Sequence, residues 1–230
     1  MRDTPESVMI FAAGFGTRMG ALTAERPKPL IPVAGRPLID HAIDIVRALG
    51  TQRIVANTHY LADMIEAHLV PKGIQISRED PEILETGGGL RKALPLLGSA
   101  PVMTLNPDVV WTGPNPLKLL NDAWDATRMD ALLLCLEPEN AIGRTGGGDF
   151  SITQGGLLSR GGPLIFGGAQ ILQTGGLAEI KETSFSLNLL WDRMIAKGRL
   201  FGLSYPGKWC DVGRPEGIVL AETLLGDHHV

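Results

Sequence analysis

Two cationic side chains near the start of this chain, Arg18 and Lys28, lie in segments that could bind phosphate groups. The apolar run Val8–Ala12 leads directly into Ala-Gly-Phe-Gly-Thr at 13–17 and then into Arg18. Small residues let a backbone approach a ligand closely, and successive free N–H groups can hold phosphate oxygens, to which Arg18 would add a charge-assisted hydrogen bond. The alternative is an ordinary turn after a strand. The segment matches neither the dinucleotide fingerprint, which needs a third glycine where Met19 stands, nor the P-loop, which needs Gly-Lys-Ser/Thr.

The second cation lies between two prolines. Pro27 and Pro29 fix the backbone on both sides of Lys28 and remove two N–H donors. We therefore expect a stiff, extended segment that aims one ammonium group. The alternative is a solvated lysine on a polyproline stretch.

Two aspartates follow or end predicted strands. Asp108 follows the predicted strand Pro101–Leu105, and Asp211 lies at the end of the predicted strand Lys208–Val212. In open α/β sheets ligands bind at the carboxyl ends of strands, so we expect the two carboxylates to converge there. Two carboxylates together with substrate phosphates suit Mg²⁺, which prefers oxygen ligands. The alternative for each is an acid in a turn or at a helix cap.

The elements that must position these residues alternate between strands and helices. Such alternation implies βαβ units with helices on both faces, so we predict a three-layer α/β/α fold with a mostly parallel, Rossmann-like sheet. The predicted strands of the first half are Val8–Ala12, Arg53–Asn57, Gly73–Ser77, Pro101–Leu105 and Ala131–Leu136, and the predicted helices are Leu38–Leu49, Leu61–Leu69, Gly89–Leu97 and Pro116–Thr127. The second half has predicted strands Pro163–Leu172, Leu200–Leu203 and Lys208–Val212 and predicted helices Ser186–Ala196 and Pro215 to about Leu225.

The composition is that of an ordinary globular chain. Of 230 residues, 44% are apolar and 20% are charged, and no linker is evident, so we expect one domain over 1–230 with a glycine-rich insertion at about 138–162. A net charge of −4 with no basic face argues against nucleic acid as a partner. No run reaches the roughly 20 apolar residues of a membrane span. Cys135 and Cys210 lie in apolar segments, which favours a reducing cytoplasm over a disulfide framework.

The N-terminal motifs together resemble the signature of the sugar-phosphate nucleotidylyltransferases. Ala-Ala-Gly-x-Gly-Thr-Arg-Met at 12–19 is followed by Pro-Lys-Pro-Leu-x-Pro-Val-x-Gly-x-Pro at 27–37, and the resemblance extends to about Ala221. It implies the fold of the nucleotide-diphospho-sugar transferases, with Lys28 at the α-phosphate and Arg18 at the β- and γ-phosphates. It also implies Mg²⁺ held by Asp108 and Asp211. The implied nucleotide-binding residues are Ala12, Ala13, Gly14, Gly16, Thr17, Glu85, Thr86 and Gly87.

A second motif narrows the resemblance. Glu-Thr-Gly-Gly-Gly at 85–89, expected as a base-contacting loop before a helix, is similar to that of the N-acetylmuramate α-1-phosphate uridylyltransferases, which act in peptidoglycan recycling. The implied substrates are UTP and N-acetylmuramate 1-phosphate, and the alternative for the motif is a flexible turn capped by Thr86. Alternative functions are transfer to glucose or mannose 1-phosphate, transfer to phosphocholine from CTP, or a non-catalytic nucleotide-sugar-binding regulator. Pro107 and Arg214 depart from the family pattern.

The acceptor side is implied by the same resemblance. The expected sugar-binding residues are Asn106, Gly148, Asp149, Phe166, Gly167 and Asn188. The alternatives are a turn acid for Asp149, a core position for Phe166 and a capping group for Asn188. Residues 137–147 are expected to form a lid, and we expect a monomer or small homo-oligomer without an acyltransferase domain. No pair among His41, His59, His68, His228 and His229 has the spacing of a zinc site.

Overall fold

A seven-stranded sheet forms the centre of the computed structural model, which describes residues 4–51, 53–98 and 101–226; His228 and His229 lie outside these ranges. The strand order is β13-β8-β12-β6-β1-β4-β5, and every neighbouring pair is parallel except the two that involve β12. The strands are β1 Ser7–Phe11, β4 Arg53–Thr58, β5 Gln75–Arg78, β6 Val102–Leu105, β8 Ala131–Leu136, β12 Ile165–Leu172 and β13 Leu200–Ser204. All six residues of β8 are buried, as expected of a strand covered on both faces.

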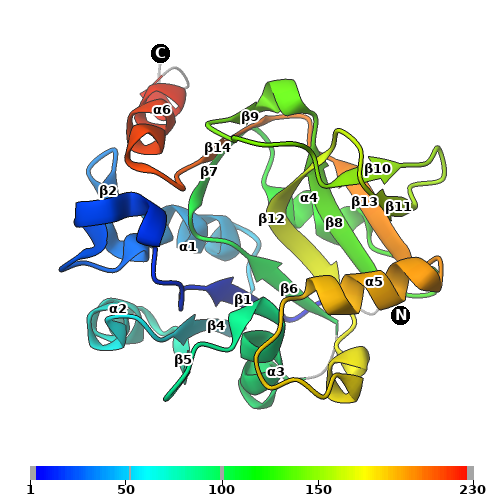
Figure 1. Ribbon diagram of the computed structural model, residues 1–230, viewed down its shortest axis with the longest axis horizontal. Helices are drawn as coiled ribbons and strands as arrows, with labels where there is room; N and C mark the ends of the chain where they lie inside the picture. The colour runs from blue at the N-terminus through cyan, green and yellow to red at the C-terminus, as the bar shows by residue number, and fades with distance from the viewer. Residues whose placement is uncertain (1–3, 52, 99–100, 227–230) are drawn as a thin grey trace.

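Helices cover both faces of this sheet (Figure 1). Helices α1 (Leu38–Ala48), α2 (Ala62–Leu69) and α4 (Pro116–Ala123) pack in one core cluster. Helices α3 (Glu85–Leu97) and α5 (Asn188–Ala196) pack in the other. The predicted three-layer α/β/α fold with a mostly parallel sheet is therefore confirmed. In the described part of the chain, no helix combines the length and hydrophobicity that crossing a membrane requires.

A second, three-stranded sheet was not predicted. It consists of β7 (Val109–Thr112), β14 (Lys208–Asp211) and β9 (Ala141–Ile142), in the order β7-β14-β9. Helix α6 (Pro215–Gly226) packs against it. The expectation that Asp211 ends a strand of the main sheet is wrong, because β14 pairs antiparallel with β7 instead.

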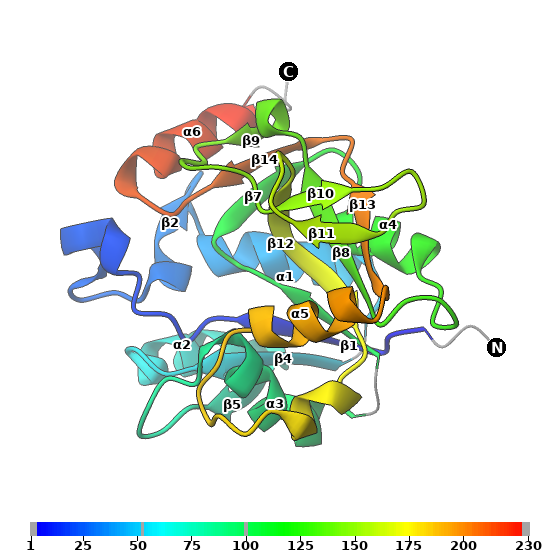
Figure 2. The same ribbon diagram turned by 45° about the vertical axis from the view of Figure 1, so that its right-hand side comes forward.

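The remaining elements are short. The predicted insertion at 138–162 contains η4 (Pro138–Asn140), β9 and the hairpin of β10 (Phe150–Ile152) and β11 (Leu158–Arg160), which stands beside β13 in Figure 2. The other short elements are η1 Thr17–Thr23, η2 Lys28–Leu30, β2 Pro32–Val33, β3 Arg36–Pro37, η3 Val70–Lys72 and η5 Gly175–Glu179. The helix predicted to reach Thr127 ends at Ala123.

Candidate functional site

Two adjoining cavities open where β1 and β6 end. One, of about 310 Å³, is bounded by the loop after β1, Lys28 and the start of α3. The other, of about 320 Å³, is bounded by β14, β12 and α5. Both are lined by Arg18, Thr86, Asn106 and Asp108, so they form one cleft, with a nucleotide half and an acceptor half as we name them here. A larger hollow of about 690 Å³ lies at the opposite edge of the sheet and contains none of the predicted site residues.

Most of the predicted residues line this cleft. Those in the nucleotide half are Ala12, Ala13, Gly14, Gly16, Thr17, Arg18, Lys28, Glu85, Thr86, Asn106 and Asp108. Those in the acceptor half are Arg18, Thr86, Asn106, Asp108, Asp149, Phe166, Gly167, Asn188 and Asp211. Gly87 and Gly148 line neither half. Their assignments as ligand-binding residues stay predictions, and their positions outside the cleft lining do not support them.

The buried carboxylate of Glu79 anchors backbone segments that line the nucleotide half. The amide N–H of Ala12 donates to Asn57 Oδ1 at 2.8 Å, and Asn57 Nδ2 donates to Glu79 Oε1 at 2.7 Å. The other oxygen of Glu79 accepts from the amide N–H of Leu84 at 2.7 Å, and Glu79 is fully buried. These bonds fix the loop after β1, the end of β4 and the segment between β5 and α3 relative to one another. The sequence argument missed Asn57 and Glu79, although both lie near the carboxyl ends of predicted strands.

The loop after β1 and the Lys28 segment pack tightly together. Gly16 has φ +64°, and a Cβ built there would lie 2.8 Å from Lys28 Cβ, so only glycine fits. Lys28 begins the short 3₁₀ turn η2, in which Leu30 N–H donates to Pro27 O at 2.9 Å. The predicted extended backbone at Lys28 is therefore wrong, because this turn closes there.

Lys28 and Asp108 form an ion pair inside the cleft. Lys28 Nζ donates to Asp108 Oδ2 at 2.7 Å, and the Lys28 side chain is 9% exposed. The alternative of a solvated lysine is wrong, because the ammonium group is buried against a carboxylate.

Asp211 joins this pair through β14. Antiparallel pairing places Asp211 opposite Val109, and Val212 N–H donates to Asp108 O at 3.0 Å. Burial and the neighbouring Asp108 raise the pKa of Asp211, against the opposing effect of Lys28 and nearby arginines. Among the described residues, no group of three or more His, Cys, Asp or Glu side chains could hold a metal ion. A cation held here would therefore need substrate phosphates or water as further ligands, as Mg²⁺ does.

The two departures from the family pattern lie at different depths. Pro107 is buried and lines the nucleotide half, whereas Arg214 is exposed and its carbonyl accepts from Gly217 N–H at 3.0 Å.

Both thiols are buried: burial raises the pKa of Cys135 to about 12, and burial together with Asp211 raises the pKa of Cys210 to about 11.

The glycines at 87–89 belong to a helix and not to the predicted loop. Helix α3 begins at Glu85, and the amide N–H groups of Gly87 and Gly88 donate to Phe185 O at 2.8 and 3.1 Å. A Cβ at Gly87 would overlap the Phe185 ring. The glycines therefore let the segment before α5 pack directly on α3.

Side chains from several elements build the acceptor half. Asp149 Oδ2 accepts from Phe166 N–H at 2.9 Å, and its other oxygen lies 3.3 Å from Arg144 Nη2. Phe166 packs edge-on against Trp191 with ring centroids 5.0 Å apart. Asn188 Nδ2 donates to Ser186 Oγ at 3.0 Å at the start of α5. The lining residues that were not predicted as site residues include Arg144, Arg160, Ser186 and Trp191.

Comparisons with known proteins identify relatives that are nucleotidyltransferases. Residues 8–170 match the family described as the MobA-like NTP transferase domain. The N-acetylmuramate alpha-1-phosphate uridylyltransferase of Caulobacter vibrioides is 38% identical over 241 aligned positions, which cover 99% of this chain and 100% of that protein. The bifunctional protein GlmU of Burkholderia mallei is 37% identical over 139 residues, which cover 60% of this chain and 30% of GlmU.

The fold is shared with a solved structure of lower sequence identity. HddC from Yersinia pseudotuberculosis, complexed with GMP-PN, superposes with a TM-score of 0.77 at 22% identity, covering 96% of this chain and 99% of HddC.

Proposed function

Because this chain belongs to the family of MobA-like NTP transferase domains and is a nucleotidyltransferase, we propose that it joins UTP to N-acetylmuramate α-1-phosphate. One observation carries the proposal: Lys28, Asp108 and Asp211 lie together where the two halves of one cleft meet. The substrates are those named for the Caulobacter relative, which this chain matches over its whole length.

The proposed reaction is an in-line displacement at phosphorus. An oxygen of the sugar 1-phosphate forms a bond to the α-phosphorus of UTP, the bond from that phosphorus to the bridging oxygen breaks, and pyrophosphate leaves with the electron pair. The attacking oxygen is already an anion at neutral pH, so no general base is needed. The barrier comes from positioning and from repulsion between anions. Lys28 would contact the α-phosphate, and Arg18 would contact the β- and γ-phosphates.

Asp108 and Asp211 would hold a magnesium ion, which would supply positive charge to the substrate phosphates. The donor set fits this ion because both ligands are carboxylates. Burial and repulsion from Asp108 raise the pKa of Asp211, so a cation would relieve an unfavourable pair of charges.

The test is pyrophosphate release from UTP and N-acetylmuramate α-1-phosphate with magnesium. Lys28→Ala should lower kcat/KM by about 10²–10³, the typical effect of removing one group that stabilises developing charge. Its fold should survive because Asp108, at 32% side-chain exposure, can be solvated once its partner is removed. Circular dichroism would check the fold.

Lys118→Ala is the matched control. Lys118 forms an exposed ion pair with Asp122 at 2.7 Å on α4 and should be replaceable without effect on rate. Turnover of Lys28→Ala at the wild-type rate would refute the role of Lys28. Turnover of glucose or mannose 1-phosphate, or of phosphocholine with CTP, in preference to the proposed pair would refute the substrate assignment.

A further inference from the structure

The acceptor half of the cleft contains an arginine that the proposed reaction does not use. Arg160 ends β11 and lines the cavity. Its Nε donates to Asp192 Oδ1 at 2.8 Å, and its Nη2 donates to Asn188 O at 3.2 Å. A guanidinium group has five N–H donors. Both donors on Nη1 meet no protein acceptor within the described residues, so they are available to a ligand.

Aromatic rings hold this guanidinium group in place. Its central carbon lies 5.0 Å from the Phe150 ring centroid and 5.6 Å from that of Trp191, within the range of cation–π attraction. The Arg160 side chain is 38% exposed. The charge is therefore fixed in position yet open to solvent, which lowers the entropy lost when it binds an anion.

The other two arginines of this cavity lie toward Asp211. Arg18 and Arg144 both act electrostatically on Asp211, which puts them on the side of the proposed phosphates. Arg160 lies where β11 meets α5, and its ion-pair partner Asp192 is 55% exposed. A surface pair of this kind is weak, so most of the charge of Arg160 remains available.

We propose that Arg160 selects acceptor sugars that carry a carboxylate in addition to the 1-phosphate. This inference rests on the proposed function. A sugar whose 1-phosphate lies near Asp108 and Asp211 would extend past Phe166 toward Arg160. N-acetylmuramate 1-phosphate carries a carboxylate on its lactyl ether, and N-acetylglucosamine 1-phosphate is the matching sugar without it. A planar guanidinium group suits this recognition because it matches the geometry of a carboxylate.

The test compares these two acceptors at saturating UTP in wild type and Arg160→Gln. The variant should lose about tenfold to a hundredfold in kcat/KM for the carboxylate-bearing acceptor, as expected for one hydrogen bond to a charged group. Most of the loss should appear in KM because the contact is remote from the reacting atoms. The preference for N-acetylmuramate 1-phosphate over N-acetylglucosamine 1-phosphate should fall by a similar factor, and Arg160→Lys should restore part of it.

Arg193→Gln is the matched control. Arg193 lies on α5, next to Asp192, in an exposed pair with Glu179 at 3.3 Å and is not among the cavity-lining residues, so the preference ratio of this variant should equal that of wild type. An equal loss on both acceptors in Arg160→Gln would make Arg160 only an anchor of the hairpin on α5 and would overturn the inference. An unchanged ratio would overturn it as well. If wild type turned over neither acceptor, the proposed function would fall and the inference with it.

Discussion

Asp211 lies where its charged form is disfavoured. Burial and the neighbouring Asp108 raise its pKa above the value expected in the unfolded chain. For a carboxyl group with a raised folded pKa, the stabilising contribution is present below the unfolded pKa and is lost as pH rises through the folded pKa. In the absence of a cation, the Asp211 carboxylate should therefore destabilise the fold at neutral pH.

Asp211→Asn should consequently raise the melting temperature at pH 7 in a chelating buffer while lowering magnesium-supported turnover by about 10²–10³. Magnesium with a non-hydrolysable UTP analogue should stabilise wild type by mass action and should stabilise the variant less. Thermal unfolding with and without chelator measures the two changes in stability, and pyrophosphate release measures the turnover. A variant that melts below wild type in chelator would contradict the argument, and Asp122→Asn, which replaces an exposed acid on α4, is the control.

At the scale of single residues, the sequence predicted those cleft residues that belong to recognisable local motifs. Lys28, Asp108 and Asp211 do converge, although for Asp211 the reason differs: it is placed by antiparallel pairing with β7 and not by the end of a main-sheet strand. Asn57 and Glu79 were missed because their bonds join segments distant in sequence, and neither residue belongs to a recognisable motif.

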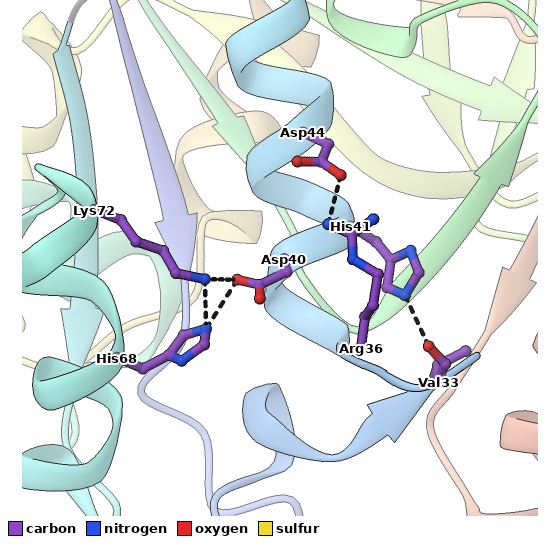
Figure 3. A network of polar contacts seen from close by, with 7 residues as sticks. All are labelled: Val33, Arg36, Asp40, His41, Asp44, His68 and Lys72. Carbon is purple, nitrogen blue, oxygen red and sulfur yellow. Dashed lines mark hydrogen bonds and ion pairs between the residues drawn. The ribbon is translucent and has the colours of Figure 1, made fainter.

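Between elements, a polar cluster links α1 to the end of α2 and η3 (Figure 3). Lys72 Nζ donates to Asp40 Oδ1 at 2.5 Å, and His68 Nε2 lies 2.9 Å from the same oxygen. Burial acts to raise the pKa of Asp40, but the hydrogen bonds to Lys72 and His68 outweigh it, and the pKa is lowered. This contribution to stability is present above the unfolded pKa and is lost as pH falls through the folded pKa.

Asp40→Asn should therefore destabilise the protein by about 1 kcal/mol at pH 7, the typical net worth of a hydrogen bond, and by progressively less below about pH 4. Urea unfolding of wild type and variant between pH 3 and 7 measures the difference. Asp44→Asn removes a neighbouring pair with Arg36 that is exposed on both sides, and should change stability by less than about 0.5 kcal/mol. A pH-independent difference for Asp40→Asn would contradict the linkage.

The alternation of strands and helices was predictable because buried parallel strands and amphipathic helices have distinct sequence periods. The second sheet was not: β14 was predicted as a strand, but its partners β7 and β9 are only four and two residues long and were missed. The start of α3 was placed four residues late because glycine is a poor helix former. Packing against Phe185 requires glycine there, so tertiary contact overrides local propensity.

At the scale of the whole molecule, hydrogen bonds between the start of α3 and the segment that leads into α5 connect the two halves of the cleft. The start of α3 lines the nucleotide half, and the start of α5 lines the acceptor half. Leu187 N–H donates to Thr86 Oγ1 at 2.9 Å, and Phe185 O accepts from Gly87 and Gly88. Displacement of α3 by a nucleotide would therefore shift the first turn of α5, which gives a physical route for coupling between the two ligands.

We expect occupancy of the nucleotide half to change the affinity for the sugar phosphate, and Thr86→Val to weaken this coupling. Calorimetric titration of the acceptor with and without a UTP analogue gives the coupling factor, which must be the same when the order of ligands is reversed. Thr86→Ser keeps the hydroxyl acceptor and should preserve the coupling. Equal coupling in wild type and Thr86→Val would exclude this link.

The burial of both thiols has a practical consequence for observing the cleft in motion. With Cys135 and Cys210 shielded and their pKa values raised, a maleimide should leave the native chain almost unmodified at neutral pH. Gly155 is exposed in the turn between β10 and β11, and a Cβ there would meet only ordinary contacts. Gly155→Cys would thus provide a single fluorophore attachment point on the hairpin that carries Arg160, without removal of any native cysteine.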